Sequence, residues 1–414
     1  MFPFERVQAR GLMTAITKTA SHLPGLTTGF SAVLLTVAVY GCAVSLLFGW
    51  GMVPIFLYVG AAGILARLFL TPRQFTIDRP MALLLALVVV IVVQGYLMSP
   101  YPTDLRFLKH LSWPLAVVAG ATMLPERLGG KLQLTHSPVV AVLALLYVVA
   151  QWVAFSVYPD AFGLFSNPHF PALYCVLTLP ILLYFAVAVG GPWRWVFILA
   201  SLGDMLLLLK TQSRPGFLAL TASALALVPL LSGRQRRVVL AAVLAVPVLL
   251  FVTGVYGFDA RMADLFGNLT REERVAIWTE TLALQSASSG PEWVFGHGFG
   301  AFLQDYQTVS SFHGIVDFSF PHNFLLEWLY SHGVVGFVLL VAAYSLFLAK
   351  LAVHTAKSVD PDRRRFGMLL IAVTTAHLTH SFFTLPFFSK STLYPLSLVL
   401  GVGLRFLKDR RADG

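Results

Sequence analysis

Charged residues are scarce in this chain: they make up 12% of its 414 residues, whereas hydrophobic residues make up 57%. Soluble domains are usually about one quarter charged, so this composition excludes an ordinary soluble domain. Cysteine is scarce as well. The two cysteines, Cys42 and Cys175, fall within predicted membrane spans, and they offer neither a disulfide framework nor a metal-ligand spacing.

The apolar residues gather in long runs. A helix that crosses a bilayer needs about 20 mostly apolar residues, because its backbone polar groups must be satisfied internally. This rule predicts an all-α integral membrane protein with about twelve transmembrane helices. The predicted spans are residues 29–50, 52–70, 81–98, 112–125, 138–158, 172–189, 194–210, 214–231, 238–256, 324–350, 366–386 and 391–407.

The distribution of positive charge predicts the orientation of these spans, because Lys and Arg are retained on the cytoplasmic side. If the N-terminus is inside, most of the 29 Lys and Arg residues fall in cytoplasmic segments and at their membrane edges. Both termini are therefore predicted to be cytoplasmic. Topology and contact with anionic lipid headgroups also account for the net charge of +10, and we find no nucleic-acid-binding motif.

One connection, residues 257–321, is much longer than the others and is predicted to be external. It separates a nine-helix region (1–256) from a three-helix region (322–414), which together form one membrane domain. Long connections usually have a function. We therefore expect the external segment to contribute to the functional site.

Two parts of this external segment have a recognisable pattern. "NLTREERVAIWTETLALQ" predicts an amphipathic helix on the outer membrane surface, with Arg274 and Trp278 on one face. "VFGHGFGAF" follows, and its Gly296, Gly298 and Gly300 permit a positive φ or a close approach of two backbones. The glycine spacing is not a dinucleotide-binding fingerprint, since no βαβ context precedes it.

Several cations and a histidine are predicted to lie at one membrane surface. Lys210 ends the seventh span, Arg214 begins the eighth, Arg274 lies in the external segment, and His322 and Asn323 begin the tenth. Taken singly, each arginine is most simply interpreted as a snorkelling or solvated side chain, and the histidine as a helix cap. Taken together they suggest a site, because imidazole titrates near neutrality and suits general-base chemistry.

Other polar residues have simpler interpretations. His297 and His313 are predicted in external loops, and His377 and His380 lie three residues apart in the eleventh span. Without a nearby carboxylate, the latter pair favours structural hydrogen bonding over metal binding. Asp204, within the seventh span, is a functional candidate by default, although a buried, hydrogen-bonded structural role is favoured over a proton relay.

Four motifs carry a family resemblance. "PHNFLLEWLYSHGVVG" resembles the signature of the O-antigen ligase and polymerase superfamily, and "TQSRPGFLAL", "RVAIW" and "FGHGFGAF" resemble its other motifs in the same order. Members move a glycan from undecaprenyl diphosphate to an acceptor hydroxyl at the periplasmic face of the bacterial inner membrane. The resemblance implies a GT-C-like fold, with His322 as the essential histidine and Arg214 and Arg274 as the essential arginines.

The chemistry of such a transfer suits these residues. Arginine makes bidentate, charge-assisted hydrogen bonds to phosphate, so Arg214 and Arg274 would stabilise the diphosphate leaving group while His322 deprotonates the acceptor. The first external loop, "FGWGM", lacks the carboxylates that hold a metal in many membrane glycosyltransferases. We therefore expect inverting, metal-independent catalysis without a cofactor. Lys210, Asn323 and Glu327 are supporting candidates; Glu327 lies off the face of His322.

Alternatives remain open at this point. Ligation of O-antigen to lipid A core leads, but an O-antigen or exopolysaccharide polymerase would share its chemistry, and a protein O-oligosaccharyltransferase is a third possibility. A glycan or lipid transporter would line a passage across the bilayer, whereas these polar residues gather at one surface. The predicted partners are a lipid-linked glycan donor, a lipid A core or other glycan acceptor, and membrane lipids, but no nucleic acid.

Overall fold

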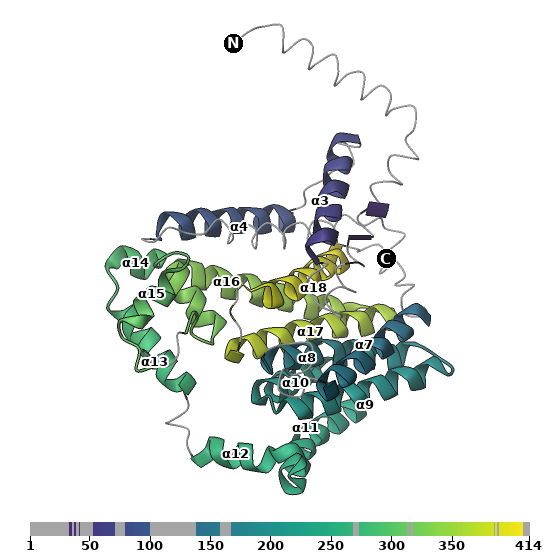
Figure 1. Cartoon of the computed structure of the whole chain (residues 1–414). Helices are drawn as coiled ribbons and strands as arrows, with labels where there is room; N and C mark the ends of the chain where they lie inside the picture. Colours follow the sequence, from purple (N-terminus) through teal and green to yellow (C-terminus); the bar gives the residue numbers. More distant parts are fainter. Residues whose placement is uncertain are drawn as a thin grey trace.

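The fold is helical throughout the part of the chain that the structure, a computed structural model, describes, and that part contains no strand (Figure 1). The described residues are 33–34, 37–38, 41, 53–70, 79–99, 138–157, 167–267, 273–312, 314, 318–384, 386 and 389–408.

Described helices occupy ten of the twelve expected spans. They are α3 (Val53–Leu70), α4 (Arg79–Leu97), α7 (Pro138–Val157), α8 (His169–Ala188), α9 (Trp193–Thr211), α10 (Arg214–Leu227), α11 (Gly233–Thr253), α16 (Phe324–Lys357), α17 (Pro361–Thr384) and α18 (Lys390–Lys408). The expected span 112–125 lies outside the described residues, and so does almost all of 29–50.

Four of these helices, α8, α11, α16 and α17, are long and apolar enough to cross a membrane by length and composition. This agrees with an all-α membrane protein. The number of twelve spans, their orientation and the GT-C-like arrangement stay predictions.

The membrane helices pack around α17, which contacts α8, α10, α16 and α18. Figure 1 shows α17 between α16 and the group formed by α7, α8, α9 and α10. The largest buried apolar cluster draws residues from α7, α8, α9, α10 and α17, and includes Tyr147, Leu173, Phe197, Leu208 and Ala376. This rigid centre fixes the helix ends at which the candidate site residues lie.

A tight turn joins α9 to α10. The α9 helix ends at Thr211, and Gln212 takes a left-handed conformation with φ 52°. Ser213 then caps α10, because its Oγ accepts a hydrogen bond from the backbone N–H of Gly216 at 3.3 Å. With Pro215 in the first turn as expected, Arg214 is fixed as the first residue of α10.

Asn323 caps α16. Its Oδ1 accepts hydrogen bonds from the backbone N–H groups of Leu325 at 2.9 Å and Leu326 at 3.1 Å. His322, just before the cap, has a positive φ of 51°, which is uncommon for a residue with a side chain. The cap therefore determines where the helix begins and holds His322 immediately outside it.

The described part of the external segment contains four α-helices: α12 (Phe258–Gly267), α13 (Glu273–Ser286), α14 (Gly290–Phe295) and α15 (Ala301–Gln307). The amphipathic helix expected within 268–285 is α13. Its Ile277 is buried with Phe302, Tyr306 and Tyr330 in a small core of its own, whereas Leu282 is 50% exposed. The segment thus packs partly on itself and partly on α16.

The glycine-rich stretch crosses α16 at very short range. Gly296, Gly298 and Gly300 all have positive φ angles, as the sequence predicts. A Cβ added at Gly296 would overlap the backbone of α16, and the backbone N–H of Gly298 donates to the carbonyl of Ser331 at 3.0 Å.

The α16 helix is itself broken at this crossing, although the sequence predicts an uninterrupted span. Gly333 has φ 63° and ψ −170°, a conformation almost restricted to glycine, and a Cβ there would overlap the carbonyl of Val294. The carbonyl of Tyr330, before the break, accepts a hydrogen bond from the N–H of His297 at 2.9 Å. The break and the crossing are therefore one structural feature.

Candidate active site

The candidate site is centred on a contact between α13 and α8. Nη2 of Arg274 lies 3.3 Å from Nε2 of His169, the first residue of α8. A guanidinium group can only donate, so Nε2 accepts and the proton of the neutral ring is on Nδ1. The backbone N–H of His169 donates to Oδ1 of Asn167 at 2.8 Å, which fixes the start of α8.

The other two predicted site residues lie near the same imidazole. Arg274, His322 and Arg214 all interact electrostatically with His169. His380, near the end of α17, interacts with both His169 and Arg274. The structure thus brings together two arginines and three histidines from five segments that are far apart in the sequence.

His322 is half-buried between aromatic rings and the cationic cluster. Its ring lies 4.3 Å from that of Phe320 and 5.4 Å from that of Phe318, centroid to centroid. Burial lowers the pKa of His322 to about 4, with a further contribution from Arg274, while a hydrogen bond to the Thr384 backbone acts in the opposite direction. His322 is therefore neutral near pH 7, as a general base must be.

Trp278 shows how α13 is held over the membrane helices. Its ring centroid lies 5.9 Å from that of Phe382 and 6.1 Å from that of Phe383, close to the carboxyl-terminal end of α17. Trp278 and Arg274 are four residues apart, so they share a face of α13. That face packs against α17 and α8, and it carries Arg274 into the cluster.

The three supporting candidates have structural contacts of their own. Nζ of Lys210 lies over the rings of Trp152 at 5.5 Å and Phe155 at 5.1 Å, a cation–π arrangement that ties α9 to α7. Asn323 is the α16 cap. Glu327 is buried in the first turn of α16, where its N–H donates to the carbonyl of Asn323 at 2.9 Å.

Three other intramembrane polar residues, Asp204, His377 and His380, each form a hydrogen bond within the helix bundle. Oγ1 of Thr178 donates to Oδ2 of the fully buried Asp204 at 2.6 Å. His377 is hydrogen-bonded to the carbonyl of Thr392 at 3.0 Å, and Nδ1 of His380 lies 3.0 Å from Oγ1 of Thr384. These contacts fit the structural interpretation of all three side chains.

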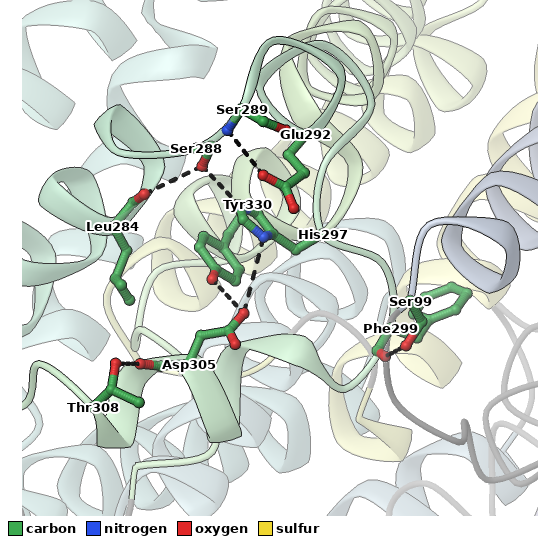
Figure 2. Close-up of polar contacts among 10 residues, drawn as sticks. All are labelled: Ser99, Leu284, Ser288, Ser289, Glu292, His297, Phe299, Asp305, Thr308 and Tyr330. Atoms are coloured by element: carbon green, nitrogen blue, oxygen red, sulfur yellow. Dashed lines mark hydrogen bonds and ion pairs between the residues drawn. The ribbon is translucent and has the colours of Figure 1, made fainter.

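A second polar cluster lies within the external segment (Figure 2). Oγ of Ser288 lies 2.7 Å from Nε2 of His297, and Nδ1 of His297 lies 3.9 Å from Oδ2 of Asp305. Tyr330 stacks on His297 at 4.2 Å and donates to Asp305 at 2.6 Å. Burial lowers the pKa of His297, against the opposing effects of Glu292 and Asp305.

This second cluster resembles a Ser–His–Asp triad in composition but not in geometry. A distance of 3.9 Å between His297 and Asp305 is too long for a hydrogen bond, and the Ser288 hydroxyl also donates to the carbonyl of Leu284 at 3.2 Å. We therefore interpret the cluster as a connection that joins α13, α14 and α15 to Tyr330 of α16. His313, the other external histidine, lies outside the described residues.

Sequence reasoning missed His169 as a site residue. A signal was present, because His169 lies in "SNPHFPALYC" at the predicted external end of the sixth span, the same level as Arg214 and His322. His380 was considered, but only as a member of a pair with His377. Neither residue lies in one of the family-like motifs. Their proximity to Arg274 could not be predicted from the sequence, because it depends on how α8 and α17 pack against α13.

Comparison with known families agrees with the motifs. Residues 195–341 match the model of the family described as O-antigen ligase; no curated protein matches the chain. The matched region includes Arg214, Arg274, His322 and the whole external segment, whereas His169 and His380 lie outside it. The family consists of membrane-embedded glycosyl-transferring enzymes. Over residues 195–341 the chain is therefore similar to the O-antigen ligase family, and this confirms the resemblance to the superfamily that the motifs indicate.

Proposed function

We propose that this protein is an inverting, metal-independent glycosyltransferase that moves a glycan from undecaprenyl diphosphate to an acceptor hydroxyl. The proposed acceptor is lipid A core, at the periplasmic face of the bacterial inner membrane. The observation that carries the proposal is the gathering of Arg214, Arg274 and His322 around one imidazole, that of His169. This combination of cations and a neutral base matches the demands of the transfer.

The two arginines would bind the donor's diphosphate. As the bond between the anomeric carbon and the phosphate oxygen breaks, its electron pair passes to the diphosphate, which gains negative charge. Guanidinium groups stabilise that charge through bidentate hydrogen bonds and do not deprotonate. Arg214 and Arg274 are both partly buried, and a partly dry site makes this stabilisation stronger than it would be in water.

His322 would act as the general base. The acceptor oxygen attacks the anomeric carbon from the side opposite the diphosphate, its proton passes to His322, and the configuration at that carbon inverts. In the free protein the pKa of His322 is lowered to about 4, by burial first and by Arg274 second. Bound diphosphate would offset the charge of Arg274, and this would raise the pKa of His322 toward the range in which a base works best.

The proposal is tested in the source organism by replacing the native copy with His322→Ala or Arg214→Ala at matched membrane levels. We expect both variants to lose the polymeric lipopolysaccharide ladder on a gel while lipid-linked long-chain polymer accumulates. His354→Ala is the matched control, because His354 lies near the opposite end of α16, and it should keep the ladder.

The other outcomes of this experiment are equally informative. Lipopolysaccharide that carries a single repeat would make the protein a polymerase and contradict ligation. An unchanged ladder in both variants would contradict the transferase proposal and the assignment of the site together.

A further inference from the structure

We infer that His169 is a positioning residue for diphosphate binding: its Nε2 accepts a hydrogen bond from Arg274 and holds that guanidinium in place for the donor. The inference rests on the proposed function, and it concerns a residue outside the part of the chain that matches the family model. His169 has no role in the proposed transfer chemistry itself, so it would act through Arg274.

In the contact between Arg274 and His169, the arginine must be the donor and the histidine the acceptor. Arg274 has no acceptor group, so the 3.3 Å contact between Nη2 and Nε2 requires an unprotonated Nε2 on His169. Among the described residues, no group forms a hydrogen bond with the buried Nδ1 atom. The contact with Arg274 is therefore the only side-chain hydrogen bond of His169 in the described part of the chain, and it joins two helices that are distant in sequence.

The charges around His169 show which effects the contact with Arg274 opposes. The groups that act on His169 electrostatically are cations or potential cations: Arg274 from α13, Arg214 from α10 and His322 from the start of α16; His380 from α17 acts on it as well. Positive charges gathered around one imidazole repel one another, and an arginine side chain loses rotamer freedom when it is held in one orientation. An acceptor on the rigid α8 helix opposes both effects and keeps Arg274 in a single orientation before the diphosphate arrives.

The α8 helix is a suitable support for this contact. It is the most buried of the candidate membrane spans, and its first turn begins at His169, with the backbone fixed by Asn167. The α13 helix has fewer buried residues. A hydrogen bond from Arg274 of α13 to His169 of α8 therefore restrains the arginine side chain by joining it to a buried helix.

The test compares three substitutions in the purified full-length protein, with undecaprenyl diphosphate as the binding probe. His169→Leu removes the acceptor and should weaken binding about 10- to 100-fold, the range expected for a lost hydrogen bond to a charged group. His169→Gln places an amide oxygen near the position of Nε2, and it should restore most of the affinity. His169→Asn reaches only the position of Nδ1, and it should behave as His169→Leu does.

A matched control separates this role from the general loss of a histidine–arginine contact. Nε2 of His354 lies 2.6 Å from Nη2 of Arg363, near the opposite ends of α16 and α17 from the site. His354→Leu should leave the affinity for undecaprenyl diphosphate unchanged. Equal weakening by His354→Leu and His169→Leu would overturn the inference.

Coupling to Arg274 provides the second measurement. If His169 acts through Arg274, adding His169→Leu to Arg274→Ala should cause no further loss of affinity. An independent loss in the double variant, or rescue by Asn but not by Gln, would mean that His169 contacts the diphosphate directly and would overturn the positioning role.

The same variants separate this inference from the proposed function. If Arg274→Ala weakens binding and His169→Leu does not, this inference fails and the proposed function stands. If neither variant changes the affinity, both fail.

Discussion

At the scale of single residues, the pKa of His322 couples the proposed base to the proposed diphosphate site. In the proposed mechanism the neutral form of His322 is the base, so we expect activity to be lost as the pH falls through the pKa of His322. Burial and Arg274 lower that pKa to about 4. Since kcat/KM reports the free enzyme, its acid limb should lie near that value, well below the ordinary pKa of histidine.

Replacing Arg274 by glutamine should move this acid limb to higher pH. The substitution removes the positive charge but leaves the burial, so the pKa of His322 should rise without returning to its ordinary value. We expect the residual activity of Arg274→Gln to fall between pH 6 and pH 4 more steeply than that of the wild type. Arg365→Gln, at an exposed ion pair with Asp362, is the control and should keep the wild-type profile; coincident acid limbs in all three proteins would contradict the coupling.

Asn323 provides a second test at this scale, because its observed contacts are those of a helix cap. Asn323→Ala should lower stability by about 0.5 to 2 kcal/mol, the usual effect of removing a cap, and displace His322. Asn323→Ser keeps an acceptor for the first-turn N–H groups and should retain both stability and activity. Thermal unfolding and transfer activity are measured together. A serine variant that is stable but inactive would indicate that Asn323 contacts the substrate instead.

At the scale of elements, the crossing of the glycine-rich stretch and α16 orders the external segment. Gly333→Ala should be strongly destabilising, because a side chain in this backbone conformation costs on the order of 1 to 3 kcal/mol and its Cβ would overlap Val294. Limited proteolysis should then cut residues 290–307 more rapidly. Gly290→Ala is the matched control, since a Cβ there meets nothing; equal protease sensitivity of the two variants would argue against the crossing.

The same elements show what sequence reasoning can and cannot reach. Ten of the spans predicted from apolar runs coincide with described helices, and the glycines of "VFGHGFGAF" have the positive φ angles that glycine permits. Both features could be predicted because they depend on local chemistry. The break at Gly333 was missed. Nothing in "SHGVVG" distinguishes it from an ordinary apolar span, and the unusual backbone depends on α14 packing against it.

At the scale of the whole molecule, topology explains why the site could be anticipated in part. Spans that alternate in direction would place Arg214, at the start of one helix, and His322, just before another, at one membrane surface, so this shared surface can be predicted by counting spans. The contact of Arg274 with His169 could not be predicted from topology. It depends on how α13 packs against the membrane helices, for example through the contact of Trp278 with Phe382 of α17.

The orientation of the whole molecule can be measured with two introduced cysteines. Val309 follows α15 and is 46% exposed, while Val359 lies between α16 and α17 and is 84% exposed. In spheroplasts, a membrane-impermeant maleimide should label Val309→Cys at once and Val359→Cys only after permeabilisation; the parent chain, with Cys42 and Cys175, gives the background. The reverse pattern would place Arg274 and His322 on the cytoplasmic side, where a periplasmic acceptor could not reach them.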